Sequence, residues 1–245
     1  MRRRRQGELR QPPGSFRDDF VEAEELVERL LDKDRTIDLL EAGCGYHTYF
    51  RFKRRLHTTG VDVSEDALRA HPNLDAWAVA DLENFDIGSD RFDAALCWNV
   101  LEHLDRPERA LANIHRALRP TAVLVLGLPN VLSIKGMTAK LTPHRFHVWF
   151  YRVAGWSGSG PHEEAPYPTK LKLGLRRRAL VNHLQSTGWD VRYVREYESR
   201  LQKGLRYRIG LTGWKWAVVR ALCRIASLAA IDATHTDTII VARKR

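Results

Sequence analysis

The chain of 245 residues contains little cysteine: Cys44, Cys97 and Cys223 lie far apart, without any paired spacing. Disulfide frameworks and structural zinc sites both depend on clustered cysteines. The composition therefore argues against both, we expect no bound metal, and a reducing, cytoplasmic setting follows.

Long apolar runs are also missing, since no uncharged stretch reaches the roughly 20 residues that span a bilayer. Arg2 to Arg5 are followed by a polar stretch rather than by the apolar core of a secretory signal. We expect residues 1–14, which end in Pro-Pro-Gly, to form a disordered basic arm.

Acidic residues are scarce in the second half of the chain. Residues 1–130 carry 19 Lys and Arg against 23 Asp and Glu, and residues 131–245 carry 21 against 7. The net charge of +10 therefore comes from the second half. A basic half suits an anionic partner such as nucleic acid, a membrane surface or a phosphorylated substrate. The alternative is codon bias, because 31 of these 40 cations are arginine.

The length and a hydrophobic content of 44% suit one sizeable core. We expect a single domain over residues 15–245. Within it, an apolar run at 37–40 reads as a buried strand, closed by Glu41 and followed by Gly43 and Gly45. A second apolar run ends in Asp62. A glycine turn after one strand and a carboxylate ending the next are typical of doubly wound α/β folds that bind a nucleoside-containing cofactor.

Two common nucleotide-binding motifs do not fit this turn. The dinucleotide fingerprint needs glycine at position 48, where the chain has Thr48, and no phosphate-binding Gly-Lys-Ser/Thr is present. Residues 41–45, Glu-Ala-Gly-Cys-Gly, instead resemble motif I of class I S-adenosylmethionine-dependent methyltransferases. Later landmarks follow in the same order: Asp62, Asp81, Phe-Asp at 92–93 and Leu-Glu-His-Leu at 101–104. This last segment is similar to that of the quinone-biosynthesis and other small-molecule methyltransferases.

The resemblance implies a doubly wound, mostly parallel seven-stranded sheet of the Rossmann-like methyltransferase fold, with an antiparallel last strand and two inserts. It also implies S-adenosyl-L-methionine as the cofactor. Glu41 would position the methionine amino group, Asp62 the ribose and Asp81 the adenine. His47 stands where the family commonly has a third glycine. The full set of implied cofactor contacts is Glu41, Gly43, Gly45, Asp62, Val63, Asp81, Leu82, Trp98 and Asn99.

Hydrophobic periodicity gives the remaining elements. We expect helices over about 16–32, 47–55, 65–70, 107–118 and 176–187, with Asp105 capping the fourth. We expect strands over about 36–41, 58–63, 76–80, 92–98, 122–128, 189–196 and 238–242.

Residues 129–175 are too long for an ordinary connection. They follow the fifth strand and are rich in aromatic residues, and the resemblance makes them an acceptor-side cap. His144 and His147 lie three residues apart, so on a helix they share a face. Either is a candidate catalytic base if the acceptor is a hydroxyl.

Residues 198–235 form the second insert. It contains a tryptophan-rich apolar helix over about 212–230 that is interrupted by Lys215, Arg220 and Arg224. Such a helix suits a membrane interface, and packing over the acceptor cleft or in a dimer is the alternative.

The sequence predicts in-line methyl transfer to the oxygen or nitrogen of a small-molecule or lipid-linked acceptor, with possible peripheral contact at the anionic inner face of a membrane. The alternatives are an RNA or protein methyltransferase that uses the basic half, or a non-catalytic cofactor-binding protein. Nucleic acid is the less favoured partner, because Val100 follows Asn99 where an Asn-Pro-Pro-Tyr motif would need proline.

Overall fold

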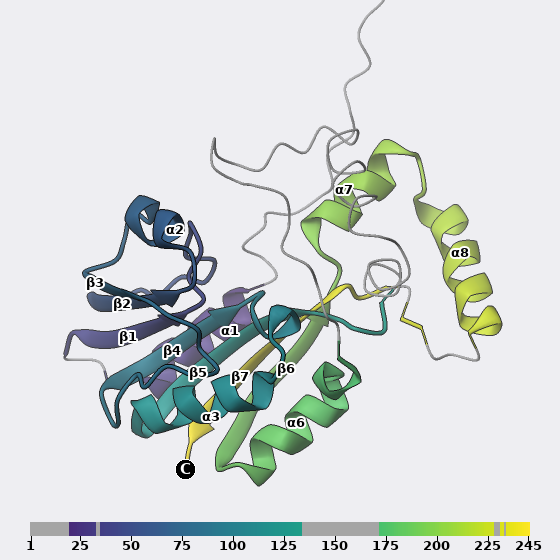
Figure 1. Cartoon of the computed structure of the whole chain (residues 1–245). Helices are drawn as coiled ribbons and strands as arrows, with labels where there is room; N and C mark the ends of the chain where they lie inside the picture. Colours follow the sequence, from purple (N-terminus) through teal and green to yellow (C-terminus); the bar gives the residue numbers. More distant parts are fainter. Residues whose placement is uncertain (1–19, 33–34, 134–171, 228–230, 233) are drawn as a thin grey trace, which may run out of the picture.

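A computed structural model describes residues 20–32, 35–133, 172–227, 231–232 and 234–245 (Figure 1). Seven strands form one sheet in the order β3-β2-β1-β4-β5-β7-β6. Strand β7 runs antiparallel to both of its neighbours, and the other paired strands are parallel. This confirms the predicted fold class. The strands are β1 (Ile37–Ala42), β2 (Leu56–Asp62), β3 (Ala76–Val79), β4 (Phe92–Trp98), β5 (Leu118–Pro129), β6 (Trp189–Tyr197) and β7 (Asp237–Lys244).

Helices cover both faces of the sheet (Figure 1). Helix α1 (Val21–Leu30) packs on one face, and α3 (Pro107–Ala117) and α6 (Arg177–Ser186) pack on the other. A short helix, α2 (Glu65–Ala70), joins β2 to β3. Helices α7 (Arg200–Arg208) and α8 (Gly213–Ala226) stand apart from the sheet beyond β6 (Figure 1).

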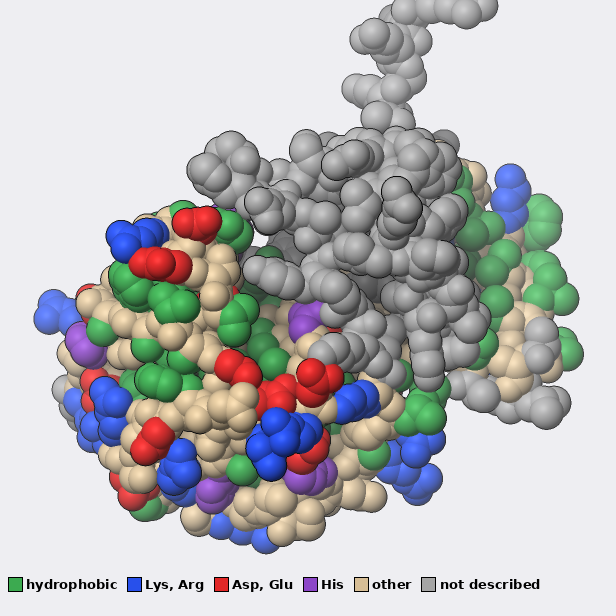
Figure 2. Space-filling model, viewed as in Figure 1, with side chains coloured by type: hydrophobic (Ala, Val, Ile, Leu, Met, Phe, Trp, Pro, Cys, Tyr) green, Lys and Arg blue, Asp and Glu red, His purple; other side chains and the backbone are tan. Residues whose placement is uncertain are grey.

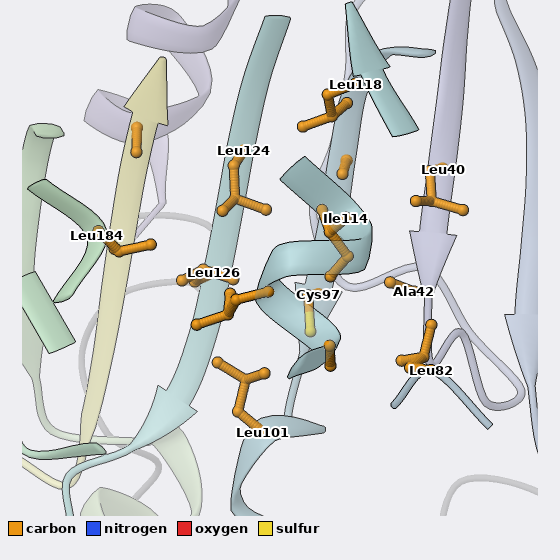
Figure 3. Packing of buried hydrophobic residues seen from close by; sticks show 14 of the residues in the cluster. Leu40, Ala42, Leu82, Cys97, Leu101, Ile114, Leu118, Leu124, Leu126 and Leu184 are labelled. Atoms are coloured by element: carbon orange, nitrogen blue, oxygen red, sulfur yellow. The ribbon is translucent and has the colours of Figure 1, made fainter. Parts of the chain in front are cut away.

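Strand β4 shows why the sheet is central to the core. Side chains alternate across a strand, so Ala95 and Cys97 join the cluster under α3, whereas Leu96 and Trp98 join the cluster under α1. Figure 3 shows the first cluster, in which Ile114 of α3 lies among the leucines of β5. A strand that is apolar on both sides suits this buried position.

The helix predicted over 47–55 is wrong, because this segment contains no regular helix. Phe50 and Phe52 are buried while the intervening Arg51 is exposed. This two-residue alternation belongs to extended chain, and aromatic and β-branched residues favour it over helix. The segment thereby adds two phenylalanines to the α1 side of the core.

Further details of the secondary structure also differ from the prediction. Arg106, not Asp105, is the N-cap residue of α3, and the backbone N–H groups of both residues donate to Glu83 Oε1. Strand β5 begins at Leu118, four residues before the predicted start. The second insert holds two helices, because α7 precedes α8; the Ser199 side chain caps α7 by accepting from the N–H of Gln202.

The predicted basic arm 1–14 and most of the predicted cap 129–175 lie outside the described residues, as does the start of the helix predicted from residue 16. Among the helices in the described ranges, none has both the length and the apolar character that crossing a bilayer requires.

Candidate functional site

The turn after β1 has a backbone that only glycine accommodates well. Gly43 has φ +75° and Gly45 has φ +53°, both in the left-handed region. A Cβ on Gly43 would lie 2.3 Å from Cγ2 of Val100, in the segment after β4. The Gly43 N–H donates to the carbonyl of Val61 at 2.7 Å, which fixes the turn against the end of β2. The carboxyl ends of β1, β2 and β4 therefore meet at this turn.

Asp62 at the end of β2 is in direct contact with the turn. The backbone N–H of Gly45 donates to Asp62 Oδ2 at 2.9 Å, and that of Ser64 donates to Oδ1 at 2.9 Å. Asp62 is partly exposed, and a carboxylate accepts more than two hydrogen bonds, so it retains capacity to accept from a ligand. Gly45 and Asp62, which are 17 residues apart, thus share one corner of the molecule.

Glu41 lies buried beneath the turn, with a side chain that is 3% exposed. Thr48 Oγ1 donates to Glu41 Oε1 at 2.6 Å, and His71 Nε2 lies 3.6 Å from Oε2. Burial raises the pKa of the Glu41 carboxyl to about 7, although the hydrogen bond from Thr48 opposes this. A cation placed beside this carboxyl would restore its ionised form.

His71 is a member of this cluster that the sequence did not reveal. Its side chain is fully buried, and burial lowers its pKa, with a further lowering from nearby His47. His71 follows α2 as its C-cap residue. No periodicity or motif marks such a position, and only the folded chain brings it to Glu41, 30 residues earlier.

The predicted cofactor contacts Val63, Asp81 and Leu82 divide into exposed and buried residues. Val63 is 62% exposed beside Asp62 and offers an open apolar surface. Asp81 is exposed and accepts from the Glu83 N–H at 2.9 Å and from the Asn84 side-chain amide at 2.6 Å. Leu82 is instead buried in the core cluster under α3 (Figure 3).

Trp98 and Asn99 end β4 in different environments. Trp98 is 8% exposed and packs edge-on against Phe20, with ring centroids 5.2 Å apart. It lies against β5 at Gly127, where a Cβ would approach its ring to 2.3 Å. Asn99 is exposed with φ +54°, and its N–H donates to the Gly127 carbonyl at 2.8 Å. Left-handed non-glycine residues of this kind are often found at functional sites.

The structure therefore brings Glu41, Gly43, Gly45 and Asp62 together, with Val63 beside them. It places Leu82 and Trp98 in the packed core. The two candidate bases, His144 and His147, lie outside the described residues.

Comparison with known proteins identifies the family and the fold. A family model described as a methyltransferase domain matches residues 15–194. An uncharacterised protein of Methanocaldococcus jannaschii is 25% identical over 121 residues, which cover 49% of this chain and 53% of that protein. The mitochondrial ubiquinone biosynthesis O-methyltransferase of Saccharomyces cerevisiae is 26% identical over 110 residues, 40% of this chain and 35% of the relative. The matches thus span about half and about a third of these curated relatives.

Among solved structures, the phosphoethanolamine N-methyltransferase 2 of Haemonchus contortus, in complex with S-adenosyl-L-methionine, superposes with a TM-score of 0.55. The alignment covers 96% of this chain and 53% of that one at 15% identity. At this identity the likeness concerns the fold.

Proposed function

The chain belongs to the methyltransferase domain family, and we propose that it is an S-adenosylmethionine-dependent enzyme that methylates a small-molecule or lipid-linked acceptor. The observation that carries the cofactor placement is the contact between the Gly45 N–H and the carboxylate of Asp62. It brings a turn with glycine at positions 43 and 45 beside an acid at the carboxyl edge of the sheet, where doubly wound folds bind their ligands.

The residues present fit such a cofactor. Gly45 leaves room for close approach of a ligand, since no atom lies within 4 Å of where its Cβ would be, and Gly43 lets the turn pack against Val100. Asp62 would accept the ribose hydroxyls, and Val63 would contact the adenine face. Glu41, whose pKa is raised to about 7 by burial, would ionise beside the methionine ammonium group.

The remaining assignments concern the adenine and the reaction centre. Asp81 would accept from the adenine amino group, and Leu82 would support the ring from the core. Trp98 and Asn99 would border the reaction centre at the end of β4. The cofactor supplies an activated methyl group, and the protein's task is to orient the acceptor for in-line attack and to exclude water. A hydroxyl acceptor would lose its proton to His144 or His147, whereas an amine needs only desolvation.

Calorimetric titration with S-adenosylhomocysteine tests the cofactor proposal. We expect saturable binding with one molecule per chain. An absence of binding up to millimolar concentrations would contradict the placement.

Helix α8 favours the lipid-linked form of the acceptor. Its outer face is apolar and exposed: Trp214 is 74%, Val218 46%, Leu222 60% and Ile225 73% exposed. These residues recur at helical spacing, so they share one stripe. Figure 2 shows apolar side chains gathered at the end of the molecule where Figure 1 places α8.

One cation of α8, Lys215, adjoins this stripe, whereas Arg220 and Arg224 lie on the other side of the helix and line a cleft. The whole segment is basic, since residues 200–227 contain seven Lys or Arg and no Asp or Glu. An anionic membrane surface contributes about 1 kcal/mol for each nearby cation, in addition to the burial of the apolar stripe. We therefore propose that α8 docks the enzyme on an anionic membrane.

Sedimentation with vesicles containing phosphatidylglycerol tests this docking. The double variant Trp214→Ser/Ile225→Ser should lose most of the vesicle-bound fraction, because both side chains are largely exposed and free to enter the interface. Trp77→Ser is the matched control, since Trp77 is an exposed tryptophan on β3 at the far end of the sheet.

Failure of the parent protein to sediment, or an equal loss in the Trp77 variant, would contradict membrane docking. A solution dimer that dissociates on the α8 substitutions would assign the stripe to a second copy of the chain.

A further inference from the structure

A large cleft opens between α6 and α8, at the carboxyl edge of the sheet. Its volume is about 1000 Å³. Arg176, Arg177 and Arg178, at the start of α6, line one side, and Arg220 and Arg224 of α8 line the other. Small-molecule sites occupy about 300–1000 Å³, so this cleft accommodates more than a single ion.

The arginines of the cleft outnumber its acids. Glu196 lies 3.4 Å from Arg177. Asp232 is occupied by His235, whose Nδ1 lies 3.0 Å from Asp232 Oδ2, and it accepts from the backbone N–H groups of Thr234 and His235. Burial acts to raise the pKa of Asp232, but these hydrogen bonds outweigh it and hold the pKa below its usual range. The carboxylate is therefore ionised and already paired within its own loop.

Four guanidinium groups are left without a counter-ion in the described part of the chain, namely those of Arg176, Arg178, Arg220 and Arg224. Like charges that converge on one cavity repel, and a bound anion removes that repulsion. The guanidinium fork matches the oxygens of phosphate in a bidentate geometry. Several such groups on opposite walls suit a phosphate or diphosphate better than a single carboxylate.

The cleft and the proposed reaction centre lie at the same edge of the sheet. Asn130, which follows the last residue of β5, lines it. Three residues earlier, Gly127 pairs with Trp98 and accepts from the Asn99 N–H, so the cleft and the end of β4 share one edge of the sheet. A group held between α6 and α8 is therefore positioned as part of the acceptor.

We propose that this arginine-lined cleft binds the phosphate or diphosphate group of the acceptor. The assignment to the acceptor rests on the proposed methyltransferase function, whereas the binding of phosphate itself does not. The outer stripe of α8 and its cleft-facing arginines then have separate partners: the bilayer and the anionic head of the acceptor.

Titration of the full-length protein with inorganic pyrophosphate tests the cleft. We expect saturable binding that weakens as salt rises and is accompanied by a higher Tm. The double variant Arg220→Gln/Arg224→Gln should bind pyrophosphate at least about tenfold more weakly, since two charge-assisted contacts are lost. These side chains are exposed, so the variant should keep the parent's Tm in the absence of pyrophosphate.

Two controls fix the location. Lys215→Gln removes a cation from the opposite flank of α8, and Arg109→Gln removes an exposed arginine from α3. Both should bind pyrophosphate as the parent does. Binding of the protein to vesicles with and without phosphatidic acid distinguishes a lipid headgroup from a free phosphate as the source of the ligand. If phosphatidic acid retains the protein on the vesicles and pyrophosphate releases it, the ligand is a lipid headgroup. If the protein binds pyrophosphate but is not retained by phosphatidic acid, the ligand is a free phosphorylated acceptor.

The proposal is overturned if the parent shows no saturable pyrophosphate binding, or if the controls lose as much affinity as the cleft variant. Titration of the same variants with S-adenosylhomocysteine distinguishes the proposal of a phosphate-binding cleft from the proposed methyltransferase function. The cleft variants should keep their cofactor affinity. Arginine-dependent pyrophosphate binding in a parent that does not bind S-adenosylhomocysteine would support the cleft and contradict the methyltransferase site.

Discussion

Replacing Gly43 by alanine is expected to destabilise the protein by about 3 kcal/mol and to abolish measurable cofactor binding. The added Cβ would lie 2.3 Å from Val100 Cγ2, and the residue would keep φ near +75°. Overpacking costs about 1–3 kcal/mol and a left-handed alanine about 1–2 kcal/mol. For a chain of this size, thermal unfolding should show a fall in Tm of roughly 6–12 °C.

Two variants separate these causes. Gly45→Ala has φ +53° but no atom within 4 Å of its Cβ, so it should cost only about 1 kcal/mol of backbone strain. Val100→Ala should restore part of the stability of Gly43→Ala, because it removes the side-chain atoms that the new Cβ meets. A Gly43→Ala protein that melts with the parent would show that the turn is wrongly described.

Replacing Asp62 by alanine is expected to weaken binding of S-adenosylhomocysteine at least about tenfold, or about 1.4 kcal/mol. The change removes the proposed acceptor of the ribose hydroxyls and also the acceptor of the Gly45 and Ser64 N–H groups. A hydrogen bond to a charged group contributes about 1.5–3 kcal/mol, so the loss should be evident in calorimetry.

Asp66→Ala serves as the matched control, since Asp66 is an exposed carboxylate on α2, four residues away. It should bind S-adenosylhomocysteine as the parent does. Asp62→Asn keeps one side-chain oxygen for the turn, so it should retain more stability than Asp62→Ala. Unchanged affinity in Asp62→Ala would remove Asp62 from the ribose site.

Much of the fold was predictable because buried parallel strands are short apolar runs. The run around Leu39 and Leu40 and the run 92–98 fixed the centre of the sheet, and the order of glycine turn, Asp62 and Asp81 indicated the family. These signals lie within single elements, where local sequence and tertiary environment agree.

The failures have equally local causes. In residues 47–55 we expected a helix after the glycine turn, but the buried side chains Phe50 and Phe52 alternate as in a strand. Helix α7 carries Gly204 and few apolar residues, so its helical tendency is weak in isolation.

Other features depend on residues that are distant in the sequence. His71 reaches Glu41 through folding alone. Arg176 and Arg220 line one cleft although 44 positions separate them, and only the net charge of the second half hinted at an anionic ligand.

The central claim is that the adenosyl cofactor lies between the glycine turn after β1 and the end of β2. The most direct test is a crystal structure of the full chain with S-adenosylhomocysteine. The account predicts ribose hydroxyls within hydrogen-bonding distance of the Asp62 carboxylate, with the backbone of Gly43 and Gly45 against the ligand. A ligand bound away from this corner, with Asp62 still occupied only by the N–H groups of Gly45 and Ser64, would contradict it.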